Sequence, residues 1–147
     1  YDKNIFVFNL SMLMPKSKLK AHSAPVMKLQ FLSEHRLFSI DKKGSAAIWD
    51  LNKSNVITRL KGIHDDVTQV AVGSDDKFLF LGTKLGYILV YDLHSYALIS
   101  KRFIKLKHLI TSLNFNEANQ ELIVGDDSGE LLFYNIFENE DILISRF

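Results

Sequence analysis

Short runs in which apolar and polar residues alternate are the main pattern along this chain. In residues 26–31, Met27, Leu29 and Phe31 alternate with polar residues, which is typical of a β-strand with one buried face. Polar stretches separate such runs, and one of them, residues 41–44, ends in Gly44, which can take the positive φ of a tight turn. The pattern predicts four short strands here, over residues 26–31, 36–40, 45–50 and 56–60.

The same four-strand pattern returns twice more. The second copy predicts strands over residues 67–72, 78–81, 87–92 and 97–103. The third copy predicts strands over residues 110–115, 121–124, 130–135 and 141–146. Because no window holds a sustained apolar stripe with a period of 3.6, we expect almost no helix apart from one turn within residues 137–141.

Three kinds of landmark recur at a nearly constant interval. Aromatic residues near the end of each third strand are 41, 42 and 43 apart, the glycines before that strand 42 and 43, and the histidines before each first strand 42 and 44. In that order, they are Phe8, Trp49, Tyr91 and Tyr134; Gly44, Gly86 and Gly129; and His22, His64 and His108. A period of about 40–45 residues with four strands is typical of propeller blades. The sequence therefore predicts an all-β fold, a β-propeller of four-stranded antiparallel blades.

About three and a half blades fit into the chain, and all belong to one predicted propeller domain. Residues 1–20 form the second half of one blade, and residues 21–62, 63–106 and 107–147 form one blade each. Residues 5–10 match a third strand, while the fourth lies around residues 11–14 or 16–20, with Pro15 suited to an edge strand or loop. Blades bury their faces only by stacking. We therefore expect an excerpt of a longer protein with about seven blades.

Two third strands end in the dipeptides Trp49-Asp50 and Tyr91-Asp92, and a histidine precedes each first strand. With these landmarks, the chain resembles the WD40 repeat family over essentially its whole length. That family places a Gly-His pair before the first strand, an Asp-Gly turn before the third strand and Trp-Asp at its end. The resemblance implies a rigid propeller that binds proteins.

The chain departs from the family pattern at two places in every blade. The turn aspartate directly before the glycine is replaced by Lys43, Leu85 and Ser128, and the glycine before the histidine by Ala21, Ile63 and Lys107. We therefore expect the family's hydrogen-bond chain of histidine, hydroxyl, aspartate and tryptophan to be incomplete, with its best surviving part in the first full blade. The residues assigned a structural role are His22, Ser39, Trp49, Tyr91 and Tyr134.

Composition narrows the class of protein. Apolar residues make up 47% and charged residues 24%, the net charge is +1 and there is no cysteine, all of which suits a soluble globular protein in a reducing compartment. No apolar run approaches the roughly 20 residues that span a bilayer, and no signal-peptide pattern is present. We expect an intracellular protein, cytoplasmic or nuclear. Charge is uneven, with 11 Lys/Arg against 4 Asp/Glu over residues 1–61, and 1 against 8 over residues 110–147.

No motif for catalysis, a cofactor or a metal is found in the sequence. Metal-ligand spacings such as Glu-x-x-His and His-x-His are missing. Adjacent aspartates at 65–66, 75–76 and 126–127 lie on predicted turns, where carboxylates are solvated and unsuited to acid–base catalysis. The 82–86 segment lacks the lysine and the helix of a phosphate-binding loop. We expect each histidine to bridge to a hydroxyl or aromatic residue of its own blade.

The predicted function is that of a non-catalytic protein–protein interaction scaffold within a multiprotein assembly. Rigid blades hold loops in fixed positions, so partners can dock across several loops at once. The predicted docking face carries the histidine loops and the turns between second and third strands. Its candidate residues are Asp41, Lys42, Lys43, His64, Asp65, Asp66, Lys84, Asp126 and Asp127.

Two other functions stay open. Basic connections between blades could bind phosphoinositides, anionic membranes or nucleic acid, although we find neither a paired-arginine motif nor aromatic residues interleaved with them. The basic candidates are Lys16, Lys18, Lys20, Lys101, Arg102, Lys105 and Lys107. The propeller could also be an accessory domain of a larger enzyme, since a fold alone does not define a function.

Overall fold

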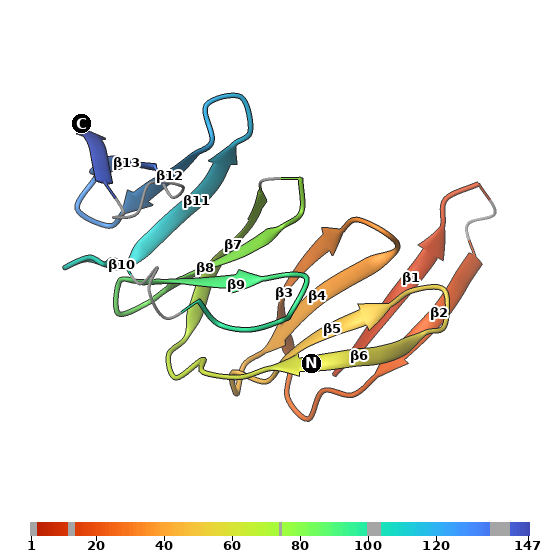
Figure 1. Cartoon of the computed structure of the whole chain (residues 1–147). Coiled ribbons are helices and arrows are strands. Elements are labelled where there is room, and N and C mark those ends of the chain that lie inside the picture. The colour runs from red at the N-terminus through yellow and green to blue at the C-terminus, as the bar shows by residue number, and fades with distance from the viewer. Residues whose placement is uncertain (1–2, 12–13, 74, 100–103, 136–141) are drawn as a thin grey trace. The chain divides into compact units, whose positions relative to one another are not determined.

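The computed structural model describes residues 3–11, 14–73, 75–99, 104–135 and 142–147 (Figure 1). Strands, turns and loops account for all of them, and no helix occurs in this part of the chain. The chain divides into two compact units, Tyr1–Lys61 and Gly62–Phe147, which we call the first and second units and describe separately.

The first unit contains a two-stranded and a four-stranded antiparallel sheet. The two-stranded sheet pairs β1 (Asn4–Asn9) with β2 (Met14–Lys20). The four-stranded sheet contains, in chain order, β3 (Val26–Leu32), β4 (Arg36–Asp41), β5 (Ala46–Asp50) and β6 (Asn55–Leu60).

The second unit contains two four-stranded antiparallel sheets, each again in chain order. One contains β7 (Val67–Gly73), β8 (Phe78–Thr83), β9 (Tyr87–Asp92) and β10 (Ile104–Lys105). The other contains β11 (Ile110–Asn116), β12 (Glu121–Asp126), β13 (Leu131–Asn135) and β14 (Ile142–Arg146). These sheets confirm the prediction of four-stranded antiparallel blades.

Register irregularities recur at equivalent places in several blades. The pairing of third and fourth strands shifts just before Phe8, Trp49 and Tyr134, the aromatic landmarks. The pairing of first and second strands shifts at the start of β3, β7 and β11. A bulge bends and twists its strand. The repeated shift is therefore a built-in part of the repeat.

Three details differ from the sequence-based expectations or lie outside the described residues. Of the strand predicted over residues 97–103, residues 97–99 form only a single bridge, from Leu98 to Tyr91, and the other four lie outside the described residues; β10 comprises Ile104–Lys105. Near the start, β2 extends over Met14–Lys20 and includes Pro15, which pairs with Phe8 at the register shift. The turn expected within residues 137–141 lies outside the described residues.

In the second unit the core lies between the two sheets. Phe115 of β11 stacks on Phe80 of β8 with ring centroids 5.4 Å apart and planes 12° apart. Two glycines make this approach possible: a Cβ at Gly73 would lie 2.1 Å from the Phe115 ring, and one at Gly82 would lie 2.6 Å from Ile110. A methyl group at either position would force the sheets apart.

In the first unit the core joins the two-stranded sheet to the four-stranded one. Ile5 and Leu19 pack with Leu37, Ala47 and Trp49, all nearly inaccessible to solvent. The opposite face of the two-stranded sheet carries apolar side chains that stay largely exposed. The exposed large side chains of β1 and β3 are Phe6, Phe8, Met27, Leu29 and Phe31.

Candidate functional site

A buried hydrogen-bond chain holds the turn end of the first unit's four-stranded sheet. Trp49 Nε1 donates to Ser39 Oγ at 2.7 Å, and Ser39 Oγ lies 2.6 Å from His22 Nε2. His22 Nδ1 lies 3.2 Å from an Asp41 carboxylate oxygen, with 1% of the His22 side chain and none of the Asp41 side chain exposed. Since Trp49 can only donate and the carboxylate can only accept, the chain runs from indole through hydroxyl and imidazole to carboxylate.

The expectation of an incomplete chain is therefore wrong for the β3–β6 blade. The carboxylate comes from Asp41 at the end of β4, three residues before Gly44, rather than from the position directly before the glycine. All four members are present in this blade. A linked set of buried hydrogen bonds of this kind fixes a single geometry.

Asp41 also shapes the turn between β4 and β5. Its Oδ1 accepts the backbone N–H groups of Lys43 at 2.9 Å and Ser45 at 3.1 Å, and Gly44 takes φ 78°. Burial alone would raise the pKa of Asp41, but these two N–H groups and His22 together hold the pKa below its usual value. Asp41 is thus a buried structural carboxylate, so we remove it from the docking candidates.

The second unit shapes its turns with different residues. In the β8–β9 turn, Thr83 replaces the aspartate, and its hydroxyl accepts the Tyr87 N–H at 3.0 Å. In the β12–β13 turn, Asp126 accepts the N–H groups of Ser128 at 3.0 Å and Glu130 at 3.2 Å. Burial alone would raise the pKa of Asp126, yet these bonds and the Ser128 hydroxyl hold it below its usual value. Asp126, only 6% exposed, is also removed from the docking candidates.

The histidines of the second unit do not bridge to a hydroxyl or an aromatic residue of their own blades, contrary to expectation. His64 is exposed, and the His108 ring lies 3.4 Å from Asp127 with about half of each side chain exposed. The reason is that Ser39 has apolar counterparts in these blades, Leu81 and Val124, two positions before Thr83 and Asp126. Neither offers a hydroxyl to an imidazole.

In the β7–β10 blade, Asp65 rather than His64 bonds to the turn between the second and third strands. Its side chain accepts the Leu85 N–H at 2.7 Å and the Asp66 N–H at 2.8 Å. Burial alone would raise the pKa of Asp65, but the Thr83 hydroxyl and these N–H groups hold it below its usual value. Asp65 thus joins the segment before β7 to the β8–β9 turn.

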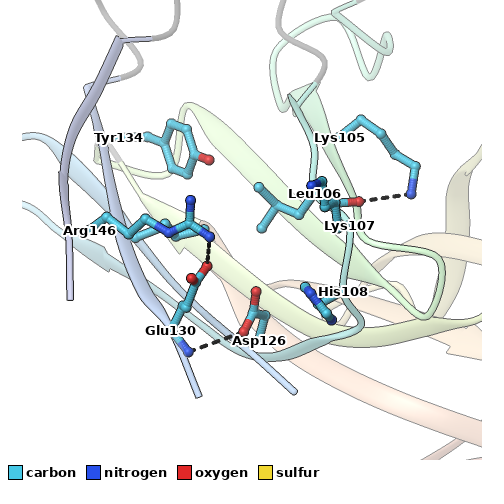
Figure 2. A pocket seen from close by; sticks show the side chains of 9 residues that line it. Lys105, Leu106, Lys107, His108, Asp126, Glu130, Tyr134 and Arg146 are labelled. Carbon is cyan, nitrogen blue, oxygen red and sulfur yellow. Dashed lines mark hydrogen bonds and ion pairs between the residues drawn. The ribbon is translucent and has the colours of Figure 1, made fainter. Parts of the chain in front are cut away.

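Two cavities lie at corresponding positions of the second unit's blades. The larger, about 360 Å³, is lined by Gly62, His64, Asp65, Thr83, Leu85, Tyr87 and Leu89. The smaller, about 190 Å³, is lined by Lys105, Leu106, Lys107, His108, Asp126, Glu130, Leu132, Tyr134 and Arg146. Figure 2 shows the smaller cavity, with Arg146 and Glu130 forming an ion pair on one side and the Lys105–His108 segment on the other.

The 105–108 segment lines the smaller cavity and forms a basic ridge against the β8–β9 turn. The Lys105 amine lies 4.4 Å from the centre of the Tyr87 ring and donates to the carbonyls of Leu85 and Leu106. The Leu106 N–H donates to the Gly86 carbonyl at 2.8 Å. A Cβ at Gly86 would lie only 2.6 Å from the Leu106 carbonyl oxygen, so glycine allows this segment to cross the turn closely.

Comparison with known proteins agrees with this geometry. No protein-family model matches the chain. It is 28% identical over 130 residues to the WD repeat-containing protein 55 homolog of Drosophila melanogaster, covering 83% of this chain and 25% of the relative. It is also 28% identical over 142 residues to the Drosophila willistoni protein of the same name, covering 91% and 27%. The chain thus spans about a quarter of the length of these relatives.

Solved structures show the same fold. The structure of U3-55K matches with a TM-score of 0.77 at 18% identity, over 88% of this chain and 41% of that one. The Myceliophteria thermophila Cps50 (Swd1) β-propeller domain matches with a TM-score of 0.71 at 16% identity, over 86% and 40%. The chain is thus similar in sequence to WD repeat proteins and shares the β-propeller fold of the solved structures. Of the three complete blades, the β3–β6 blade alone carries the full Asp41–His22–Ser39–Trp49 chain among the described residues.

Most of the remaining docking candidates are on the surface of these blades. Lys42 and Lys43 are exposed on the first unit's β4–β5 turn. On the second unit, His64, Asp66, Lys84 and Asp127 are exposed and Asp65 is half-buried. The exposed candidates of each unit thus lie on or beside its turns between second and third strands.

The basic candidates fall into two groups. Lys16, Lys18 and Lys20 are exposed on β2, a strand rather than the expected connection, and the Lys18 amine lies 5.0 Å from the centre of the Phe6 ring. Lys105 and Lys107 are exposed on the ridge. Lys101 and Arg102 lie outside the described residues.

Sequence reasoning missed several residues at these surfaces. The Arg146–Glu130 pair joins β14 to the β12–β13 turn, and Leu85 is 58% exposed at the tip of the β8–β9 turn. An apolar residue at the tip of a turn was the available signal for Leu85. No helix long and apolar enough to cross a bilayer is present in the described part of the chain.

Proposed function

We propose that these WD40 blades belong to a larger propeller that acts as a non-catalytic protein-interaction scaffold inside the cell, as a subunit of a multiprotein assembly. The observation that carries the proposal is the contrast at the turn ends. Buried Asp41 and Asp126 and the Thr83 hydroxyl hold the turn backbones rigidly, while charged side chains beside them are exposed. Rigid loops with exposed side chains suit docking, because little conformational entropy is lost on binding.

The chemistry of the described residues supports a binding role. They contain no group of three or more His, Asp or Glu side chains placed to hold a metal ion. The buried carboxylates are bonded to backbone N–H groups, and their lowered pKa values suit permanent acceptors better than proton-transfer groups. Similarity to proteins named as WD repeat proteins suits a scaffold, and the absence of cysteine suits a reducing compartment.

The uncovered apolar side chains support the proposal that further blades flank this segment. Phe115 of β11 is 8% exposed because it packs against β7 and β8, whereas Phe31, at the same position of β3, is 69% exposed. Likewise Phe6 is 44% exposed, while Ala47 and Leu89, its counterparts in the next blades, are buried. In a complete propeller, neighbouring strands would cover these positions.

Nucleic-acid or anionic-lipid binding through β2 is the less favoured function. Exposed Phe6 and Phe8 beside Lys16, Lys18 and Lys20 are the interleaved aromatic and basic residues that the sequence appeared to lack, and stacked bases could use them. However, the counterparts of both aromatics are buried in every complete blade. We therefore assign them to packing between blades.

The proposed function is tested by reversing charge at the first unit's turn. The Lys42→Glu/Lys43→Glu variant of the full-length protein, made in its native cell type, should lose co-purifying proteins that the wild type retains, measured by quantitative mass spectrometry. The matched control is Lys77→Glu, an exposed lysine on the β7–β8 turn. Equal recovery from wild type and the double variant would count against docking at this turn.

A further inference from the structure

We propose that a segment of the full-length chain directly before Tyr1 covers the apolar face of the first unit, by adding two strands to the open edge of β1 and packing against β3. This inference rests on the proposed scaffold, in which further blades flank this segment, and names the part of the protein that covers one face. The relatives leave room for such a segment, since the chain spans about a quarter of their length.

The face to be covered is a groove between β1 and β3. The groove has a volume of about 460 Å³, and both strands line it, with Phe6, Met27 and Leu29 among its walls. Met27, Leu29 and Phe31, the apolar residues along one face of β3, are each more than half exposed. A contiguous apolar surface of this kind is typical of a face that another part of a protein covers.

The pairing of β1 marks it as the third strand of an incomplete blade. Its register against β2 shifts just before Phe8, as the register of third and fourth strands does before Trp49 and Tyr134. In each four-stranded sheet the third strand pairs on both sides, whereas β1 pairs with β2 alone among the described strands. Because an open strand edge presents backbone groups that accept another strand, β1 offers the place for the second strand of its blade.

The second unit shows what occupies the equivalent space. There the third strand is β9, which pairs with β8, and β8 pairs with β7. The next blade packs its first strand, β11, against both β7 and β8. Leu113 and Phe115 of β11, the counterparts of Leu29 and Phe31, thereby pack into the core between the sheets. By this comparison, the groove beside β1 and β3 has room for a first and a second strand.

The spacing of the repeat gives the length of the covering segment. Counted back from the landmark Tyr91, β7 begins 24 positions earlier and β8 ends 8 positions earlier. The same spacings counted back from Phe8 place two strands within about the 17 residues directly before Tyr1. A segment joined so closely to β1 has a high effective concentration at its edge, which favours it over a separate protein or a second copy of the chain.

The contact at Phe31 also sets a requirement on the sequence of the segment. In the second unit, Phe115 lies so close to β7 that a Cβ at Gly73 would be 2.1 Å from its ring. Gly73 is 18 positions before Tyr91, so its counterpart lies about 11 residues before Tyr1. We expect glycine there, because a larger residue would exclude the Phe31 ring.

Cysteine accessibility in the full-length protein tests whether the face is covered. Phe31→Cys and Leu29→Cys are each treated with a fluorescent maleimide, with wild type as the blank and the exposed loop position Ser23→Cys as the matched control. Because the reaction needs a solvent-accessible thiol, both face positions of the purified monomer should react at least about tenfold more slowly than position 23. Circular dichroism establishes that each variant is folded.

Disulfide formation tests whether the segment before Tyr1 is the cover. Phe31→Cys is combined in turn with a cysteine at each of about five residues centred on the eleventh before Tyr1, and the proteins are oxidised in dilute solution. The positive control is Gly73→Cys/Phe115→Cys, since a Cβ at Gly73 would lie 2.7 Å from that of Phe115 and a small shift gives the roughly 3.8 Å of a disulfide. We expect at least one test pair to form an intramolecular disulfide, identified by mass spectrometry of tryptic peptides.

The inference fails if positions 29 and 31 of the purified monomer react as fast as position 23, because the face is then open. It also fails if the face is protected but only the control pair cross-links, since another part of the protein then covers it. Cross-links between two molecules would identify a second copy as the cover and overturn the inference as well.

The outcomes for the segment and for the scaffold function are separable. If protection appears only in the assembly that co-purifies from cells, another protein covers the face; the scaffold function then stands and this inference fails. Conversely, an intramolecular disulfide together with unchanged partner recovery from Lys42→Glu/Lys43→Glu supports the covering segment and counts against docking at that turn.

Discussion

Replacement of Ser39 by alanine tests whether the buried hydrogen-bond chain stabilises the β3–β6 blade. Ser39 is completely buried, and its hydroxyl links the Trp49 indole at 2.7 Å with the His22 imidazole at 2.6 Å. Alanine has nearly the same volume, so the change removes hydrogen bonds without opening a large cavity. It leaves one donor and one acceptor buried without their partner.

The expected cost follows from these two orphaned groups. A buried polar group that loses its partner costs about 1–3 kcal/mol. With two such groups and some relaxation, Ser39→Ala should lower the free energy of unfolding by about 2–4 kcal/mol. Urea unfolding of the full-length protein, followed by far-ultraviolet circular dichroism, measures this. The matched control Ser23→Ala removes an exposed hydroxyl and should stay within about 0.5 kcal/mol of wild type.

A second comparison separates the energy of the Ser39–Trp49 hydrogen bond from other effects of the two substitutions on stability. Trp49→Phe removes the indole donor, and a double-mutant cycle with Ser39→Ala measures the coupling between the two positions. We expect a coupling of about 0.5–3 kcal/mol. A loss below about 0.5 kcal/mol for Ser39→Ala, with an unchanged denaturant slope, would refute the reasoning.

The remaining predictions concern packing and pH. Gly73→Ala should destabilise the protein by about 1–3 kcal/mol, because its methyl group would overlap the Phe115 ring, and chemical denaturation checks this. A Gly73→Ala protein as stable as wild type would mean that the two sheets are loosely packed. The lowered pKa of Asp126 means that its contribution to stability is complete above the unfolded-state pKa near 3.9 and disappears as the pH falls through the lower folded-state pKa. Asp126→Asn should therefore be less stable at pH 7 and lose less stability than wild type between pH 5 and pH 2, as measured by melting temperature; parallel pH profiles would contradict this.

Periodic landmarks in the sequence were enough to predict the blades because each blade repeats a local pattern. Alternation, turn glycines and aromatic spacing act within about 40 residues, and the structure confirms four-stranded antiparallel sheets in chain order. In the β7–β10 blade, alternation predicted the fourth strand over residues 97–103, of which 97–99 are described and form only a bridge, while the described pairing with β9 is made by Ile104 and Lys105.

The sequence predicted which turns the candidate docking residues lie on, but not whether their side chains are buried or exposed. Sequence placed Asp41 and Asp126 on turns correctly, but turn residues can point either inward to backbone N–H groups or outward to solvent. Both point inward. Lys42, Lys43 and Lys84, which lack such bonding roles, are exposed. Burial of a turn carboxylate depends on which N–H groups converge on it, and a one-dimensional pattern does not contain that information.

What the sequence alone determined is the repeat: strand order, turn positions and the place of each landmark aromatic. These follow from local preferences and from the need of every blade to bury two faces. The tertiary structure alone decided which landmarks form bonds. His22 is buried against Asp41 and Ser39, whereas His64 and His108, with the same spacing, are exposed because Leu81 and Val124 offer them no hydroxyl. A histidine's role depends on the residue that faces it across the sheet, and only the folded chain brings that residue near.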